Sequence, residues 1–211
     1  MSATIYDWPT LSRYPAEMEL GLRANTQVFV SELSGQVQTV ELPGTRWTAS
    51  FRISNLERAD DAAELEALLA KLRGQANRLR LPVFSRRAPR GTWAGSPTVN
   101  NEVGSPTLSQ TGGTLYVKNF TAGATVKKGD LFNLGANGQL LMNTADGTAD
   151  GSGLLQLSVQ PNIRTAPAHG TALVSTNPVI PQMILSDPHA RWTHRAGDEA
   201  DFAFDLIEVF A

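Results

Sequence analysis

The run from Asn25 to Ile53 alternates apolar and polar residues in three short bursts. Ser34-Gly35 and Pro43-Gly44 separate the bursts, whose apolar positions are Val28/Val30, Val37/Val40/Leu42 and Trp47/Ala49/Phe51/Ile53. A period of two residues is typical of half-buried strands, and glycine and proline pairs are typical of the tight turns between them. The run therefore predicts a small antiparallel sheet with one buried side.

Composition predicts a folded chain. At 211 residues and 41% hydrophobic residues, the chain is long and apolar enough to bury one or two cores. With 18 Lys+Arg against 20 Asp+Glu, the formal net charge of -2 argues against a protein that mainly neutralises nucleic-acid phosphate. The absence of cysteine excludes disulfides and cysteine nucleophiles and fits folding in a cytosol. Neither a secretion signal nor a membrane-spanning segment is expected from the sequence.

One segment has the period of an amphipathic helix. Ser54 and Glu57 have the spacing of a capping box, and Leu65, Leu68, Leu69 and Leu72 recur at intervals of three and four. Gly74 follows as a stop. A single short helix in a chain of this length predicts a mainly β protein in which the helix braces a sheet.

The rest of the chain is predicted to form strands of two modules. Residues 78–84 alternate again, and a region rich in Gly, Thr, Ser and Asn then carries β bursts at 114–117, 130–134, 139–142 and 154–159. Strands return at 183–185, 191–194 and 201–210. Because neither chain end can bury a face alone, we expect a discontinuous domain, 1–94 plus 181–211, with a β module inserted at 95–180.

Candidate metal sites are weak in this sequence. Asp187, His189, His194 and Asp198 offer donors without a defensible ligand spacing, so a structural role is favoured over a metal. Residues 146–153 are acidic and glycine-rich like a calcium loop, but they lack the bidentate acidic residue of an EF-hand, and a hairpin loop is favoured. No metal ligand is assigned.

No catalytic or cofactor-binding residue is assigned either. No serine lies in a Gly-x-Ser-x-Gly elbow, and the glycines near Gly135 lack the lysine and helix of a phosphate loop. Asn137-Gly138 predicts a two-residue hairpin turn with positive φ at both positions. The basic cluster around Arg86 and Arg87 is interpreted as a solvated or subunit-facing surface in preference to a nucleic-acid site. We therefore expect a protein that is not an enzyme and needs no cofactor.

Several motifs together resemble the distal tail proteins of long-tailed phages and prophages. They are Trp8-Pro9-x-Leu11-x-x-Tyr14-Pro15, the run from Ser34 to Trp47, Leu72-Arg73-Gly74, Pro89-Arg90-Gly91 and Lys128-Gly129-Asp130-x-Phe132-x-x-Gly135. The resemblance spans nearly the whole chain. It implies a mainly β protein: a β-sandwich ring domain with one bracing helix, built from both chain ends, and an inserted small β-barrel or β-sandwich module.

The resemblance also implies a function and its partners. Distal tail proteins form a ring, commonly a hexamer, that joins the tail tube protein to the hub or central fibre proteins of the tail tip. The ring can carry fibres or a receptor-binding protein. The implied location is the distal end of the virion tail, after assembly in the host bacterial cytoplasm, with neither sequence-specific nucleic-acid binding nor membrane insertion.

Two groups of residues follow from this hypothesis. The expected core of the ring domain is Val28, Val37, Val40, Leu42, Trp47, Phe51, Leu65, Leu68, Leu69 and Leu72. Inter-subunit or lumen contacts are expected from Arg78, Arg80 and Arg90.

Two other classes of function stay open. The first is a carbohydrate-binding module in which Trp93, Tyr116 and Phe120 stack on host surface glycan. The second is a tail-associated hydrolase, for which the sequence offers no acid/base pair in a recognisable setting.

Overall fold

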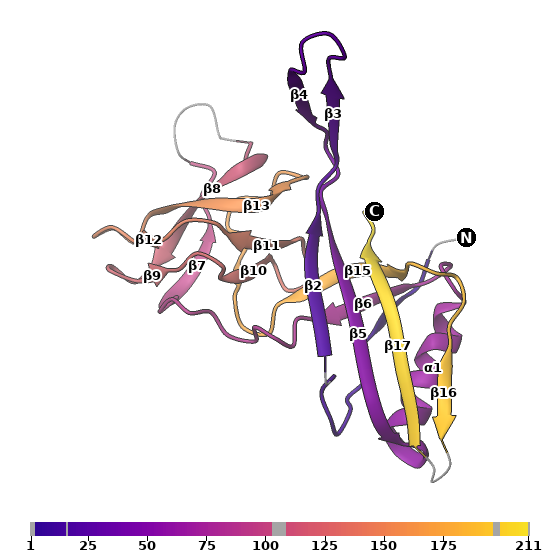
Figure 1. Cartoon of the computed structure of the whole chain (residues 1–211). Coiled ribbons are helices and arrows are strands. Elements are labelled where there is room, and N and C mark those ends of the chain that lie inside the picture. Colours follow the sequence, from indigo (N-terminus) through magenta and orange to yellow (C-terminus); the bar gives the residue numbers. More distant parts are fainter. Residues whose placement is uncertain (1–2, 16, 103–108, 196–198, 211) are drawn as a thin grey trace.

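The fold is mainly β. A computed structural model describes residues 3–15, 17–102, 109–195 and 199–210 (Figure 1). Strands hold 48% of the residues and helices 7%, which confirms the predicted fold class. No helix in the described ranges is long and apolar enough to cross a membrane.

Both ends of the chain contribute to the larger sheet. Its seven strands include the path β1-β6-β15-β17-β5-β2, with β16 paired to β17. Their bounds are β1 Ile5–Asp7, β2 Glu17–Arg23, β5 Arg46–Glu57, β6 Arg78–Pro82, β15 Val179–Leu185, β16 Trp192–Arg195 and β17 Glu199–Glu208. The C-terminal strand β17 lies between β5 and β15, and all of these contacts are antiparallel. Among the described strands of this sheet, only β1 and β6 run parallel.

The middle of the chain forms a second sheet, nearly closed like a barrel. Its six strands follow the order β14-β10-β11-β13-β8-β7. Their bounds are β7 Gly95–Val99, β8 Gly112–Phe120, β10 Leu131–Leu134, β11 Leu140–Asn143, β13 Leu155–Ile163 and β14 Leu173–Val174. A small ladder joins β9 Thr125–Val126 to β12 Gly147–Thr148. The four predicted β bursts of this region coincide with β8, β10, β11 and β13.

Helix α1, Ala63–Leu72, covers one side of the larger sheet and follows a π-helical turn at Arg58–Ala62. The predicted capping box is wrong, because Ser54 and Glu57 lie in β5, whose pairing with β17 continues to Glu57. The cap position is instead Ala62, which has helical backbone angles and makes no side-chain cap. Gly74, with φ of 66°, follows the helix as predicted.

The main core lies between α1 and the larger sheet. Six predicted core residues are buried there: Trp47, Phe51, Leu65, Leu68, Leu69 and Leu72. Leu131 and Leu140 of the barrel-like sheet belong to the same cluster, so the two sheets share apolar contacts. The barrel-like sheet has a second cluster of its own around Phe132, Leu115 and Val159.

Three predicted core residues are exposed instead. Val28, Val37 and Val40 lie in a separate hairpin of β3 Thr26–Val30 and β4 Val37–Glu41, and Leu42 at its foot is half-buried. The prediction of burial is wrong for the three valines, because no other element of the described chain packs on this hairpin.

The turn between β10 and β11 also differs from its prediction. Neither Asn137 nor Gly138 has a positive φ; Gly135 does, with φ of 75°. The N–H of Leu134 donates to the Gln139 carbonyl at 3.2 Å and closes the loop 135–138. Gly138 is needed there for space, since a Cβ would lie 1.8 Å from the Leu134 carbonyl oxygen.

Candidate functional site

The most conspicuous surface feature is the hairpin of residues 26–41, here called the arm (Figure 1). Strands β2 and β5 pair along Glu17–Arg23, and the chain between them continues outward as β3 and β4. Figure 1 shows the arm projecting away from both sheets. The arm is therefore the distal part of a long hairpin whose proximal part belongs to the larger sheet.

A bend separates the arm from the sheet. The Leu42 N–H donates to the Asn25 carbonyl at 2.7 Å, and the Asn25 side-chain amide donates to the Pro43 carbonyl at 2.9 Å. Proline cannot donate to a strand ladder, and Gly44 has φ of 117°, a value that favours glycine. The Pro43-Gly44 pair predicted as a turn thus interrupts the hairpin without reversing the chain.

The arm exposes apolar side chains on both of its faces. Val28 lies opposite Thr39, and Val30 opposite Val37, so the three valines share one face. Val28 is 58% exposed, Val30 62% and Val37 60%. Phe29 and Val40 are exposed on the other face, and Leu33 is fully exposed at the tip. An apolar two-faced hairpin of this kind is typical of a segment that another chain covers.

The strand edges of the arm are also open. β3 and β4 pair only with each other in the described chain, so each has one edge without a neighbouring strand. A two-stranded hairpin is marginally stable by itself in water, and an open edge is a template for another strand. The arm therefore has both the apolar faces and the edges for association.

A buried ion pair lies beside the foot of the arm, which is the region of residues 23–25 and 42–46 that joins the arm to β2 and β5. Both Arg164 guanidinium NH2 groups donate to the Glu208 carboxylate, each at 2.8 Å, and Glu208 is fully buried. Arg164 also donates to the Thr45 carbonyl at 3.0 Å, and the Trp47 N–H donates to Glu208 at 2.9 Å. This network ties together the foot of the arm, the C-terminal strand and the end of β13.

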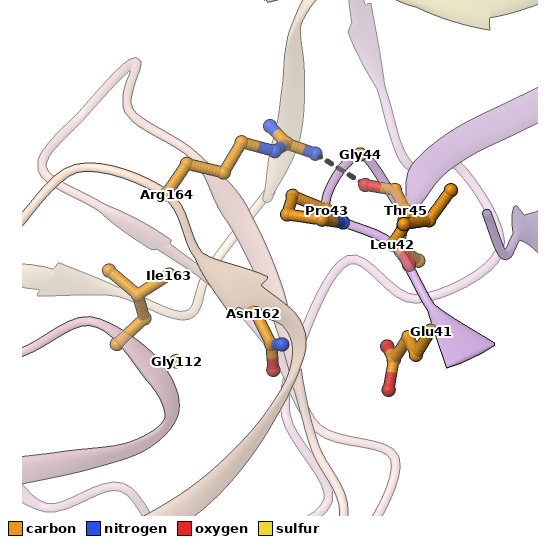
Figure 2. A pocket seen from close by; sticks show the side chains of 9 residues that line it. All are labelled: Glu41, Leu42, Pro43, Gly44, Thr45, Gly112, Asn162, Ile163 and Arg164. Carbon is orange, nitrogen blue, oxygen red and sulfur yellow. Dashed lines mark hydrogen bonds between the residues drawn. The ribbon is translucent and has the colours of Figure 1, made fainter. Parts of the chain in front are cut away.

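Arg164 also borders a cleft beside the foot of the arm (Figure 2). Its volume is about 410 Å³, and its lining combines the arm's foot with the barrel-like sheet: Glu41, Leu42, Pro43, Gly44, Thr45, Gly112, Asn162, Ile163 and Arg164. In Figure 2 the Arg164 side chain reaches across to the Thr45 carbonyl. Because the Arg164 guanidinium is already bound to Glu208, it is not a free charged group for catalysis in this cleft.

The pair of Glu208 and Arg164 was not predicted from the sequence. Glu208 continues the inward row of Phe202, Phe204 and Leu206, so the alternation does assign it to a buried face. An acidic residue there requires a cationic partner. The partner lies 44 residues away in the other module, at a distance along the chain that no local pattern reveals.

The three arginines predicted to make inter-subunit or lumen contacts lie apart from the arm. Arg78 and Arg80 are on β6, where Arg80 forms an ion pair with Asp7 at 2.6 Å. Arg90 lies in the segment between β6 and β7, and its backbone N–H donates to Asp130 at 2.7 Å. Their contacts with other subunits stay a prediction.

Asp130 organises the connection between the two modules. Its buried carboxylate accepts hydrogen bonds from the N–H groups of Arg90, Gly91 and Lys127 and from the Trp93 indole, at 2.7 to 3.1 Å. Burial acts to raise the pKa of this carboxyl, but the N–H donors outweigh it and hold the pKa below its usual value. Asp130 is thus a structural carboxylate with its acceptors occupied.

The residues considered for a metal do not converge in the structure. His189 lies 3.5 Å from Asp187, whereas His194 lies 3.5 Å from Glu66 on α1. Asp198 lies outside the described residues. Within the described part of the chain, no three histidine, cysteine, aspartate or glutamate side chains are grouped to hold a metal. In the glycine-rich loop, the Asp150 carboxylate accepts from the N–H groups of Ser152 and Leu154.

The aromatic residues considered for glycan binding are mostly covered. Trp93 and Phe120 are buried and pack edge to face with centroids 5.6 Å apart, and Tyr116 is half-buried. A sugar needs an exposed ring face for stacking. Trp93 and Phe120 do not provide one.

No protein-family model matches this chain, and no curated protein matches it.

Proposed function

We propose that this protein is a structural subunit of a phage tail, a distal tail protein that assembles with copies of itself into a ring. The observation that carries the proposal is the arm, which exposes apolar side chains on two faces and leaves two strand edges open. The motif resemblance supplies the setting, namely the junction between tail tube and tail tip. The ring is expected to be a hexamer and to offer attachment for fibres.

The shape of the subunit supports a head-to-tail assembly. Closed rings need two different surfaces on each subunit, one for each neighbour. The arm projects from one end of the larger sheet, away from both sheets, so the arm and the two sheets offer two different surfaces (Figure 1). A stable interface buries at least about 1,000 Å² in total, and every residue of both arm strands is exposed and can contribute to such an interface.

The proposed function is interface formation without turnover of a substrate. The cleft beside the arm contains no unengaged acid/base pair, and Asp130 is occupied by structural hydrogen bonds. The burial of Trp93 and Phe120 gives the glycan-binding alternative no support.

An arm-shortened variant tests this proposal. Residues 27–40 are replaced by Asn-Gly, which joins the paired residues Thr26 and Glu41 through a two-residue turn. Wild-type protein should form a ring-sized oligomer in light scattering and rings in electron microscopy, and the variant should be a folded monomer. A wild-type chain that stays monomeric at high concentration would refute the ring, as would an arm-shortened variant that assembles normally.

A further inference from the structure

Two arginines oppose each other at the foot of the arm. Arg23 ends β2 and lies directly opposite Arg46, the first residue of β5. Directly opposed side chains of antiparallel strands lie on the same face, and like charges at such positions destabilise the pair. The sheet thus concentrates positive charge where it meets the arm.

Neither arginine has a carboxylate partner within the described residues. Arg46 donates through Nε to the Gly44 carbonyl at 3.3 Å, and its guanidinium lies 5.0 Å from the centre of the Phe210 ring. Arg23 is exposed. Arg164, whose guanidinium lies 3.7 Å from the same ring, is by contrast fully paired with Glu208. The charge of the Arg23 and Arg46 pair is therefore available to an acidic group from outside.

The tip of the arm carries a negative charge that complements the two arginines. Glu32 is exposed and has no cationic partner in the described chain, and its neighbour Leu33 is fully exposed. The turn is closed by the backbone, through hydrogen bonds of 2.9 Å from Ser31 to Gln36 and from Gly35 to Ser31. The Glu32 and Leu33 side chains are thus free of any role in the turn.

Glu32 is too far from the arginines of its own chain. The tip is separated from the foot by five-residue strands, and a strand residue advances about 3.4 Å, so the two ends lie roughly 17 Å apart. A contact between the tip and these two arginines therefore requires a second copy of the chain.

We propose that the arm tip of one copy docks on the arm foot of its neighbour. Glu32 pairs there with Arg23 and Arg46, and Leu33 packs against the partly exposed ring of Phe210. This inference rests on the proposed ring function and names the contact that orders its subunits. In the proposed ring this contact is heterologous, because each copy gives its tip to one neighbour and receives the tip of the other neighbour on its foot.

A charge exchange tests the contact. Glu32→Arg and Arg23→Glu should each weaken self-association about tenfold or more, since each places like charges together at an interface. The double variant, which restores opposite charges, should recover most of the wild-type affinity. Arg23 is the better partner to change, because Arg46 also contacts Gly44 and Phe210. Sedimentation velocity over a concentration series measures the affinity, and circular dichroism verifies the fold.

A matched control and the arm-shortened variant separate the outcomes. Glu64→Arg reverses an exposed glutamate on α1 and should leave assembly unchanged. If the arm-shortened variant is monomeric but the single charge reversals assemble normally, or the double variant is not rescued, the tip-to-foot contact is wrong while the ring function stands. If wild-type protein does not assemble, the ring function fails and this contact fails with it.

Discussion

The β2–β5 hairpin and the arm are two halves of one long hairpin, and the apolar residues of β5 are buried in the first half whereas those of the arm are exposed in the second. Both alternate apolar and polar residues, and both pair in regular antiparallel register. In the proximal half, β17 pairs with β5 and α1 covers the inward side, so Trp47 and Phe51 are buried. In the arm, no strand or helix of the described chain is added, and Val28 and Val37 are exposed. Alternation therefore specifies a face, and a neighbour decides whether that face is covered.

The largest difference is expected between Trp47→Ala and Val28→Ala. Trp47 fills the core and donates its indole N–H to the Leu140 carbonyl at 3.0 Å, so its truncation should cost about 3–5 kcal/mol of unfolding free energy. Val28→Ala should change it by less than about 0.5 kcal/mol. Urea unfolding at concentrations where the chain is monomeric makes the comparison. Equal costs would contradict the exposed arm.

The ion pair at the foot of the arm should rank next. Glu208→Gln leaves the Arg164 guanidinium without its counter-charge in a largely buried setting, and we expect a loss of about 3 kcal/mol in unfolding free energy. Glu41→Gln, on the exposed arm nearby, serves as the control and should have almost no effect. Denaturation curves of the two variants that coincide would argue against a buried pair.

The loss of folding stability at acid pH should involve Asp130, which lies outside the arm. Because the pKa of Asp130 is lowered in the folded protein, its contribution is full above the unfolded pKa of about 4 and is lost as pH falls through the lower folded pKa. Asp130→Asn should cost about 2 kcal/mol at pH 7 and flatten the decline of stability between about pH 5 and 2. The arm-shortened variant should keep the wild-type decline, and a decline unchanged by Asp130→Asn would count against this assignment.

The smallest effect on folding should accompany a large effect on assembly. Replacing Val28, Val30 and Val37 together by threonine keeps β-branched residues on the arm but removes its apolar face. Monomer unfolding should change by less than about 0.5 kcal/mol, whereas light scattering should show loss of the oligomer. Leu154→Thr, at an exposed apolar position directly before β13, should leave assembly intact. Loss of the oligomer in this control would mean that the arm has no special role.

Local patterns predicted most of the elements because their signals are local. Leu65, Leu68, Leu69 and Leu72 repeat at the helical period and are all buried. The predicted helix start was wrong because Ser54 and Glu57 satisfy a cap spacing but are held in β5 by its ladder with β17. A cap motif is a few residues long, whereas that ladder depends on a strand near the other end of the chain.

The candidate site was predictable only in part. The strands of the arm and the bend at Pro43-Gly44 are visible in the sequence, but their exposure is not, since Val28 and Phe51 occupy similar positions in similar patterns. Arg164 and Glu208 form their pair across 44 residues, and nothing local to either residue indicates the other.

The sequence by itself determined that this protein is mainly β, where most of its strands and its helix lie, and which side chains of each strand share a face. These properties depend on periods of two and 3.6 residues that every short segment carries. Only the tertiary structure decided that β17 and α1 cover one half of the long hairpin and leave the other half bare. Burial depends on which distant segments arrive at a face, and the arm is the place where none of the described segments of this chain does.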